Sequence, residues 1–136
     1  MLQYEKQPVT PQGVPKPLGP YSPCVRVGPF IFVSGQGAMD PATGDIKSQD
    51  IAAQTRATLL NLKAVLEGAG SSLDRVVKTT VFLRDVADFE AMNRVYAEFF
   101  AVNPPARSCV EVSGLVGKMR IEIEAIALLG TQAGQD

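Results

Sequence analysis

The sequence predicts a single α+β domain in which two helices cover one face of a β-sheet. Three observations support this prediction. The chain has 136 residues, the length of one ordinary domain. Two segments show the apolar spacing of amphipathic helices, and five others are β-branched, aromatic or alternating. In chain order these segments give ββαβαββ, an arrangement typical of a two-layer domain.

A proline-rich segment precedes the first predicted strands. Six of the ten prolines lie within residues 7–23. Proline fixes φ and has no backbone donor, so we expect an extended arm along the surface. Strands are predicted at residues 25–27 and 30–35, and the Gly28-Pro29 pair between them predicts a hairpin. Residues 40–45 are predicted to form a loop.

Residues 51–67 have helical periodicity. The apolar stripe recurs every three or four positions and consists of Ile51, Thr55, Leu59, Leu62 and Leu66. The polar positions outside the stripe are Gln54, Arg56, Asn61, Lys63 and Glu67. Ser48 or Asp50 can cap the start of this helix, and Gly68 and Gly70 are expected to end it.

One strand, a second helix and two final strands follow. Residues 76–83 are β-branched and predict a strand. The second helix is predicted from about Asp88 to the Asn103-Pro104-Pro105 segment. Its apolar stripe consists of Phe89, Met92, Val95, Tyr96, Phe99 and Phe100. Strands are predicted at residues 106–112 and 120–128, and the short glycine-containing loop between them predicts an antiparallel hairpin.

Alternation along the last two strands assigns their side chains to faces. Arg107 and Cys109 share one side of the first strand, and Glu122 and Glu124 share one face of the second. We expect the sheet face that the helices leave open to carry Arg107, Glu122 and Glu124 beside apolar neighbours. A half-polar face on so small a protein predicts an oligomer interface.

Charge and composition exclude several classes of site. Thirteen basic and 14 acidic residues give a net charge of −1, which argues against an electrostatic nucleic-acid binder. The chain has no histidine, which excludes a Ser-His-Asp triad, a Cys-His dyad and a His-ligated metal site. Cys24 and Cys109 lie far apart, so two free thiols in a reducing compartment are expected.

The sequence shows no signal for export or membrane insertion. The first residues, MLQYEKQPVTPQG, lack the apolar core of a signal peptide. No apolar run approaches the length of about 18 residues that a membrane-spanning helix needs. We therefore expect a cytoplasmic protein, or one of an organelle matrix.

Several side chains can carry chemistry, and each has a structural alternative. Arg107 opens a strand, where it is either a solvated charge or a guanidinium fork for a carboxylate or phosphate. Glu122 and Glu124 either divide acid and base roles or face water from an edge strand. Cys109 is expected to be a small buried side chain, because no histidine is present to activate its thiol.

The turns before and after the first hairpin are less specific. Tyr21 lies in a stiff Gly-Pro-Tyr-Ser turn, and Ser34 and Gly35 follow an apolar strand. Each can contact a ligand or simply belong to the packing. The glycines match neither a phosphate-binding loop nor a dinucleotide fingerprint. These residues alone therefore predict an anion-binding arginine at most and do not name a reaction.

Seven segments together resemble the RidA/YjgF family of reactive-intermediate (enamine and imine) deaminases. They read GPYSP (19–23), FVSGQ (32–36), DPATGDI (40–46), VVKTTVFL (76–83), DFEAMNRVYAEFF (88–100), PARSCVEV (105–112) and RIEIEAIA (120–127). The resemblance covers about residues 18–129, and the combination of PARSCVEV and IEIEAIA is specific. The loop after PARSCVEV, the residue Cys24 and the longer proline-rich arm depart from the better-known members, which leaves substrate preference open.

The resemblance implies a chorismate-mutase-like fold assembled as a homotrimer, with sites in clefts between adjacent subunits. It implies hydrolysis of 2-imino or enamine acids to 2-oxo acids and ammonia, without a cofactor or metal. Arg107 then corresponds to the arginine that binds the substrate carboxylate, and Glu122 to the glutamate that holds the attacking water. The substrate-binding positions that it implies are Tyr21, Ser34, Gly35, Asn93 and Cys109.

On this resemblance, residues 1–17 are the proline-rich arm, residues 18–130 the RidA-like domain and residues 131–136 a C-terminal tail. The expected partners are a small imino acid and further copies of the chain, with no membrane and no nucleic acid. Two alternatives stay open. One is an endoribonuclease or translation inhibitor, which the balanced charge disfavours. The other is a non-catalytic small-molecule-binding or chaperone-like protein that uses the same inter-subunit cleft.

Overall fold

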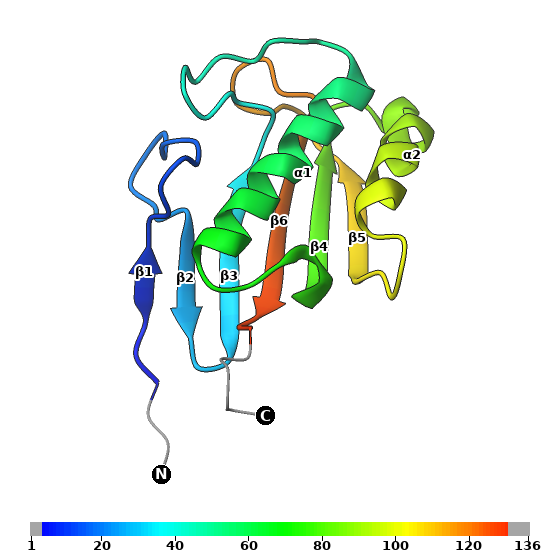
Figure 1. Ribbon diagram of the computed structural model, residues 1–136. Coiled ribbons are helices and arrows are strands. Elements are labelled where there is room, and N and C mark those ends of the chain that lie inside the picture. Colours follow the sequence, from blue (N-terminus) through cyan, green and yellow to red (C-terminus); the bar gives the residue numbers. More distant parts are fainter. Residues whose placement is uncertain (1–3, 131–136) are drawn as a thin grey trace.

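The computed structural model of the protein describes residues 4–130, so the first three residues of the predicted arm and the predicted 131–136 tail lie outside it. One six-stranded sheet, with strand order β1-β2-β3-β6-β4-β5, carries both helices on the same face (Figure 1). This confirms the predicted α+β class and the layer arrangement. The predicted order ββαβαββ is present, preceded by one additional short strand, β1 (Gln7–Val9).

The N-terminal strands form a three-stranded antiparallel edge. The predicted hairpin is confirmed as β2 (Cys24–Val27) and β3 (Phe30–Gln36), and Gly28 in its turn has a φ of 54°. The extra strand β1 pairs with β2 and carries Pro8 in its middle. A proline fits here because an edge strand leaves one side of its backbone unpaired. Part of the segment predicted as an extended arm therefore extends the sheet.

Helix α1 (Ile51–Gly68) buries the whole predicted stripe against the sheet. Its start is capped as predicted, because the Asp50 carboxylate accepts a hydrogen bond of 2.9 Å from the backbone N–H of Ala53. Gln54 and Asn61 lie outside the apolar stripe, yet both are buried. They are buried because loops cross this side of the helix and their main-chain atoms hydrogen-bond to the two amides.

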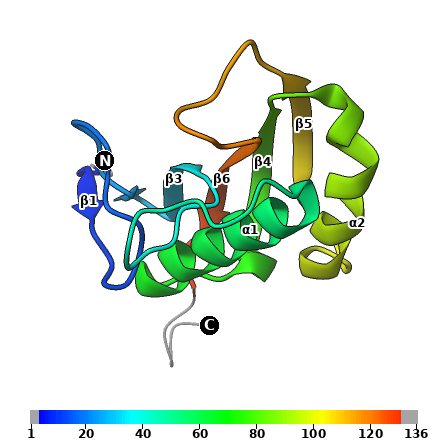
Figure 2. The ribbon, with the colours of Figure 1, turned by 90° about the horizontal axis from the view of Figure 1, so that it is seen from above.

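The second half of the chain begins with β4 (Val76–Leu83), which follows a short 3₁₀ turn, Leu73–Arg75. Helix α2 (Phe89–Phe99) comes after a second turn, Val86–Asp88, and packs beside α1 (Figure 2). It buries Met92, Val95 and Tyr96 of its predicted stripe and leaves Phe89 partly exposed. Within residues 4–130, no helix has both the length and the apolar character that crossing a membrane requires.

The predicted hairpin of the last two strands is wrong. β5 (Ala106–Glu111) pairs with β4 in parallel, whereas β6 (Ile121–Leu128) lies between β3 and β4 and is antiparallel to both. The connecting loop passes the end of β4 (Figures 1 and 2). Every second residue of β6 is an apolar side chain buried under the helices, which favours a central position. β5 has no fully buried residue and occupies the edge.

The two faces of the sheet differ in what covers them. Thr79 and Val81 of β4 lie under the helices, and Arg107 and Cys109 are their register partners, so these two side chains point to the covered face. Glu122 alternates with buried residues and points to the open face, as does Glu124. The expectation that Arg107 shares the open face with the two glutamates is therefore wrong. Alternation gives relative directions within one strand, and the phase of β5 depends on its pairing with β4.

Candidate active site

A cleft of 580 Å³ lies at the end of β3 and collects four of the predicted site residues. These are Tyr21, Ser34, Gly35 and Glu122. One wall comes from the proline-rich arm, and another from the end of β3. A third comes from the loop before β6, which contributes Val116 and Met119. Segments far apart in the sequence thus meet around one carboxylate.

The end of β3 brings its backbone close to Glu122. The register between β3 and β6 shifts between Val33 and Gln36, so Ser34 and Gly35 form a bulge. A Cβ placed on Gly35 would lie 2.7 Å from Cδ of Glu122, which is too close for two carbon atoms. The glycine therefore leaves room for the Glu122 carboxylate at the bottom of the bulge.

The environment of Glu122 favours its protonated form. Burial of the side chain raises its pKa above the ordinary glutamate value, and the nearby charge of Glu124 adds to this effect. Glu124 itself is exposed. Besides these two glutamates, the cleft is lined by one charged residue, Lys16 of the arm. A carboxylate with a raised pKa in a cleft is suited to accept and return a proton.

Ser34 and Tyr21 fix the shape of the cleft by local hydrogen bonds. The Ser34 hydroxyl donates to the carbonyl of Ser22 at 2.6 Å, which joins β3 to residues 18–23, the segment after the arm. The Tyr21 hydroxyl accepts from the backbone N–H of Leu18 at 3.0 Å, and its ring is 46% exposed. These contacts hold residues 18–23 in place as a wall of the cleft and leave the Tyr21 ring exposed beside it.

Arg107 belongs to a second cluster, at the edge strand β5. Its Nη1 donates to Oδ1 of Asn93 at 2.8 Å. Its guanidinium carbon lies 4.7 Å from the ring centre of Tyr96 and 5.6 Å from that of Phe89. The rings and the amide orient the guanidinium plane. No carboxylate within residues 4–130 pairs with Arg107, so the oriented fork suits an external anion.

Cys109 lies two residues after Arg107 on the same side of β5 and packs against the core. Burial raises the pKa of its thiol, more than the nearby Arg107 lowers it, so the thiol stays protonated near neutral pH. Both Cys109 and Cys24 are free, as predicted. This environment favours a packing role over a nucleophilic one.

Replacing Cys109 with serine is therefore expected to retain most of the activity proposed below. Serine keeps the size and the backbone and removes only a protonated thiol. The check is kcat/KM for a 2-imino acid in the wild type and the variant. A loss of several orders of magnitude, with an unchanged circular dichroism spectrum, would instead identify the thiol as a nucleophile.

The structure does not bring all predicted site residues together within one chain. Arg107, Asn93 and Cys109 lie on the covered face at the edge of the sheet, whereas Tyr21, Ser34, Gly35 and Glu122 line the cleft on the other side. Arg107 and Glu122 of one chain thus lie on opposite faces of the sheet. Each chain therefore carries two separate groups of predicted site residues, which are called half-sites below.

Sequence reasoning missed several residues of these half-sites. The cleft also includes Lys16, Met39, Val116 and Met119, which lie in loops where no periodicity reveals their direction. Periodicity predicts Tyr96 in the apolar stripe of α2, and the structure confirms this position. Its hydroxyl hydrogen-bonds to Oγ1 of Thr79 at 2.7 Å while its ring contacts Arg107.

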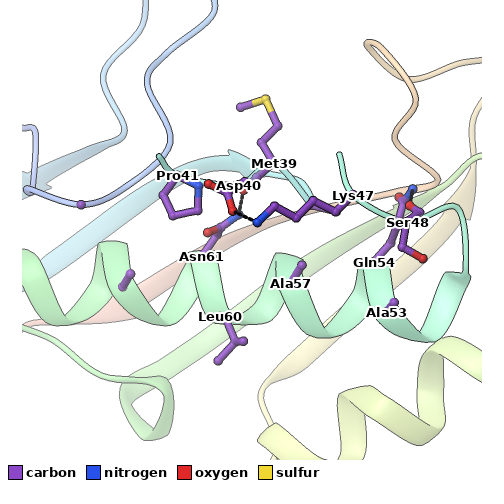
Figure 3. A pocket seen from close by; sticks show the side chains of 13 residues that line it. Met39, Asp40, Pro41, Lys47, Ser48, Ala53, Gln54, Ala57, Leu60 and Asn61 are labelled. Atoms are coloured by element: carbon purple, nitrogen blue, oxygen red, sulfur yellow. Dashed lines mark hydrogen bonds and ion pairs between the residues drawn. The ribbon is translucent and has the colours of Figure 1, made fainter. Parts of the chain in front are cut away.

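A second cavity, of 420 Å³, lies between α1 and residues 38–48 and contains no predicted site residue (Figure 3). Its apolar floor is formed by α1, and the Lys47–Asp40 ion pair of 2.7 Å lies across it. Hydrogen bonds from Lys47 and from two backbone amides lower the pKa of Asp40 to about 2. Within residues 4–130, no group of three or more Cys, Asp or Glu side chains is arranged to hold a metal ion.

Known proteins are similar to this chain in sequence and in fold. Residues 12–129 match the family model described as Endoribonuclease L-PSP. A RutC family protein of Pyrococcus horikoshii is 52% identical over 122 residues, which cover 90% of this chain and 97% of the relative. A 2-iminobutanoate/2-iminopropanoate deaminase of Salmonella typhimurium is 43% identical over 123 residues, 88% of this chain and 95% of the relative. The crystal structure of the E. coli YjgF gene product matches with a TM-score of 0.85 and 42% identity, covering 90% of this chain and 98% of that one.

Proposed function

The chain belongs to the Endoribonuclease L-PSP family, and from this membership and its two half-sites we propose that it hydrolyses 2-imino and enamine acids to 2-oxo acids and ammonia. The match to the YjgF protein bears out the resemblance to RidA/YjgF proteins seen in the sequence. One relative that aligns over nearly its whole length is named as an imine deaminase, which supports this reaction class.

One observation carries the proposal more than any other. Glu122 is a partly buried carboxylate with a raised pKa, set in a cleft where Gly35 leaves it room. Hydrolysis of an imine needs a group that takes a proton from water and gives it back to the leaving amine. A glutamate whose pKa lies above its ordinary value is better matched to both steps near neutral pH.

The proposed reaction proceeds in two steps. Arg107 binds the substrate carboxylate through the part of its fork that Asn93 does not occupy, which fixes the imine carbon beside a water held by Glu122. The water oxygen bonds to the carbon of the protonated imine, its proton passes to Glu122, and a carbinolamine forms. Glu122 then returns the proton to nitrogen, and its carboxylate accepts the carbinolamine hydroxyl proton as the C=O bond forms and the C–N bond breaks. Ammonia and the 2-oxo acid are released, and ammonia takes the proton from Glu122 as it leaves.

The separation of the two half-sites supports a site shared between chains, and the resemblance to RidA/YjgF proteins implies that the assembly is a closed homotrimer. Phe30, Phe32 and Val110 on the open face are between 39% and 46% exposed, which leaves an apolar surface for another subunit to cover. In a ring of identical contacts, the β5 edge of one subunit would face the cleft of the next. Each complete site would then take Arg107 from one chain and Glu122 from its neighbour.

The test of the proposed function is release of ammonia and 2-oxo acid from imines generated in situ from several amino acids. We expect release above the uncatalysed rate, and light scattering should give the mass of three chains. Retained ligand affinity without turnover would favour a binding protein instead. A mass of one chain at micromolar concentration would contradict the assembly.

A further inference from the structure

Gln54 of helix α1 is a buried polar residue that the proposed reaction does not use. It is 1% exposed, and all of its side-chain hydrogen bonds reach main-chain atoms. Its Nε2 donates to the carbonyl of Ser48 at 2.8 Å and to that of Lys118 at 3.1 Å. Its Oε1 accepts from the backbone N–H of Arg120 at 2.7 Å. Figure 3 shows the side chain of Gln54 next to Ser48, where both line the 420 Å³ cavity beside α1.

We propose that Gln54 is a positioning residue for Glu122. Its amide holds the loop before β6, which forms one wall of the cleft, and the backbone at the start of β6, the strand that carries Glu122. The effect on turnover rests on the proposed function, whereas the effect on the position of Glu122 does not. Gln54 touches neither substrate nor reacting atoms and acts only through these contacts.

The first contact fixes the start of β6. Arg120 immediately precedes this strand, and Glu122 is its second residue. The Arg120 guanidinium is itself held by both carboxylate oxygens of Asp88, at 2.8 and 3.0 Å, and by the carbonyl of Gln49 at 3.0 Å. The Gln54 amide binds the backbone N–H of Arg120, so the main chain and the side chain of this residue are both held by hydrogen bonds.

The second contact fixes the wall of the cleft. The carbonyl of Lys118 belongs to the loop that contributes Val116 and Met119 to the lining. Met119 is buried and lies against Gly37 of the opposite wall. Without the Gln54 amide, the carbonyl of Ser48 and the backbone N–H of Arg120 lose a buried partner, and the carbonyl of Lys118 keeps only its bond from exposed Gln49. The loop can replace the lost hydrogen bonds by moving toward water.

Such a movement has a defined electrostatic consequence. Burial is the main cause of the raised pKa of Glu122, ahead of the charge of Glu124. The charged groups that line the cleft with Glu122 are Glu124 and Lys16, and neither touches Gln54. A looser wall admits water, which lowers the pKa of Glu122 toward its ordinary value.

The experiment compares Gln54→Met with two control variants. Methionine keeps the length of the side chain and removes the donors and the oxygen acceptor. Gln49→Met is the matched control, because exposed Gln49 also donates to the carbonyl of Lys118, at 3.1 Å, but does not contact the Arg120 N–H. Leu59→Ala is a control for lost stability, because Leu59 is fully buried and outside the lining of the cleft.

The readouts are an NMR titration of the Glu122 side-chain carboxyl and the kinetics with a 2-imino acid. In Gln54→Met we expect the titration midpoint at a lower pH and kcat reduced by up to about 10²-fold, the scale of a misplacement of about 1 Å. Both controls should keep the wild-type midpoint. If Gln54→Met does not fold, Gln54→Asn replaces it, since its shorter amide cannot reach both loops.

An unchanged Glu122 midpoint in a folded Gln54 variant would overturn the proposal, and so would an equal shift in Leu59→Ala. If the wild type releases no ammonia, the proposed function fails, but the titration still decides whether Gln54 positions Glu122. The two failures are therefore distinguishable.

Discussion

Replacing Glu122 with glutamine is expected to lower kcat for 2-imino acids by roughly 10²-fold or more, the usual scale for loss of a general base. Glutamine keeps the size and the carbonyl oxygen that can hold water, and it fills the same space beside Gly35. It cannot accept the proton of the attacking water. KM should change little, because in the proposed reaction Arg107 holds the substrate carboxylate. Steady-state kinetics on imines generated in situ measure both constants.

Glu124→Gln is the matched control for this variant. Glu124 lies two residues along the same strand, about 7 Å away, and is exposed. We expect a much smaller loss of kcat.

Glu122 must be ionised to act as a base, so activity should fall as the pH drops through its raised pKa. Removing the Glu124 charge lowers that pKa, so the acidic limb of the pH profile should move to lower pH. Equal losses in both variants would indicate a shared carboxylate pair.

Arg107→Ala is expected to lower kcat/KM for 2-imino acids by about 10²-fold or more. This is the expected cost of two charge-assisted hydrogen bonds at roughly 1.5–3 kcal/mol each. Arg107→Lys should be severely impaired as well, because a lysine offers a point charge without the planar fork. Both variants should act mainly by raising KM. Their effect should be small for imines without a free carboxylate, such as imino esters.

Arg94→Ala is a suitable control for charge, since Arg94 is an exposed arginine next to Asn93 on α2. It should behave like the wild type. Full activity of Arg107→Lys with carboxylate substrates would mean that the carboxylate is held elsewhere in the site.

Local patterns in the sequence predicted most elements of the fold. The spacing of Ile51, Leu59 and Leu66 identified α1, because burial against a flat sheet requires one apolar face. β1 was missed, because Pro8 argues against a strand unless the strand lies at an edge. The pairing of β5 was mispredicted, because the short loop before β6 favoured a hairpin. The structure instead places β6 between β3 and β4, where its apolar face is buried, and this placement depends on the whole sheet.

The candidate site was only partly predictable for the same reason. Motifs in the sequence single out Arg107 and Glu122 as candidate site residues. Their placement on opposite faces of the sheet follows from the parallel pairing of β5 with β4. Periodicity placed Gln54 outside the apolar stripe of α1 and could not show that residues 64 and 66 positions further along would bury it. Contacts between distant segments are not encoded in local spacing.

The central claim, that a complete site takes Arg107 from one chain and Glu122 from another, is tested most directly by mixing two inactive variants. Arg107→Ala and Glu122→Gln chains are refolded together in equal amounts, and ammonia release from an imine is compared with that of each variant alone. After random reassembly about a quarter of all sites would combine an intact Arg107 with an intact Glu122, so about a quarter of the wild-type rate should return. A rate no higher than that of the separate variants would contradict the claim, since a site built within one chain cannot be restored by mixing.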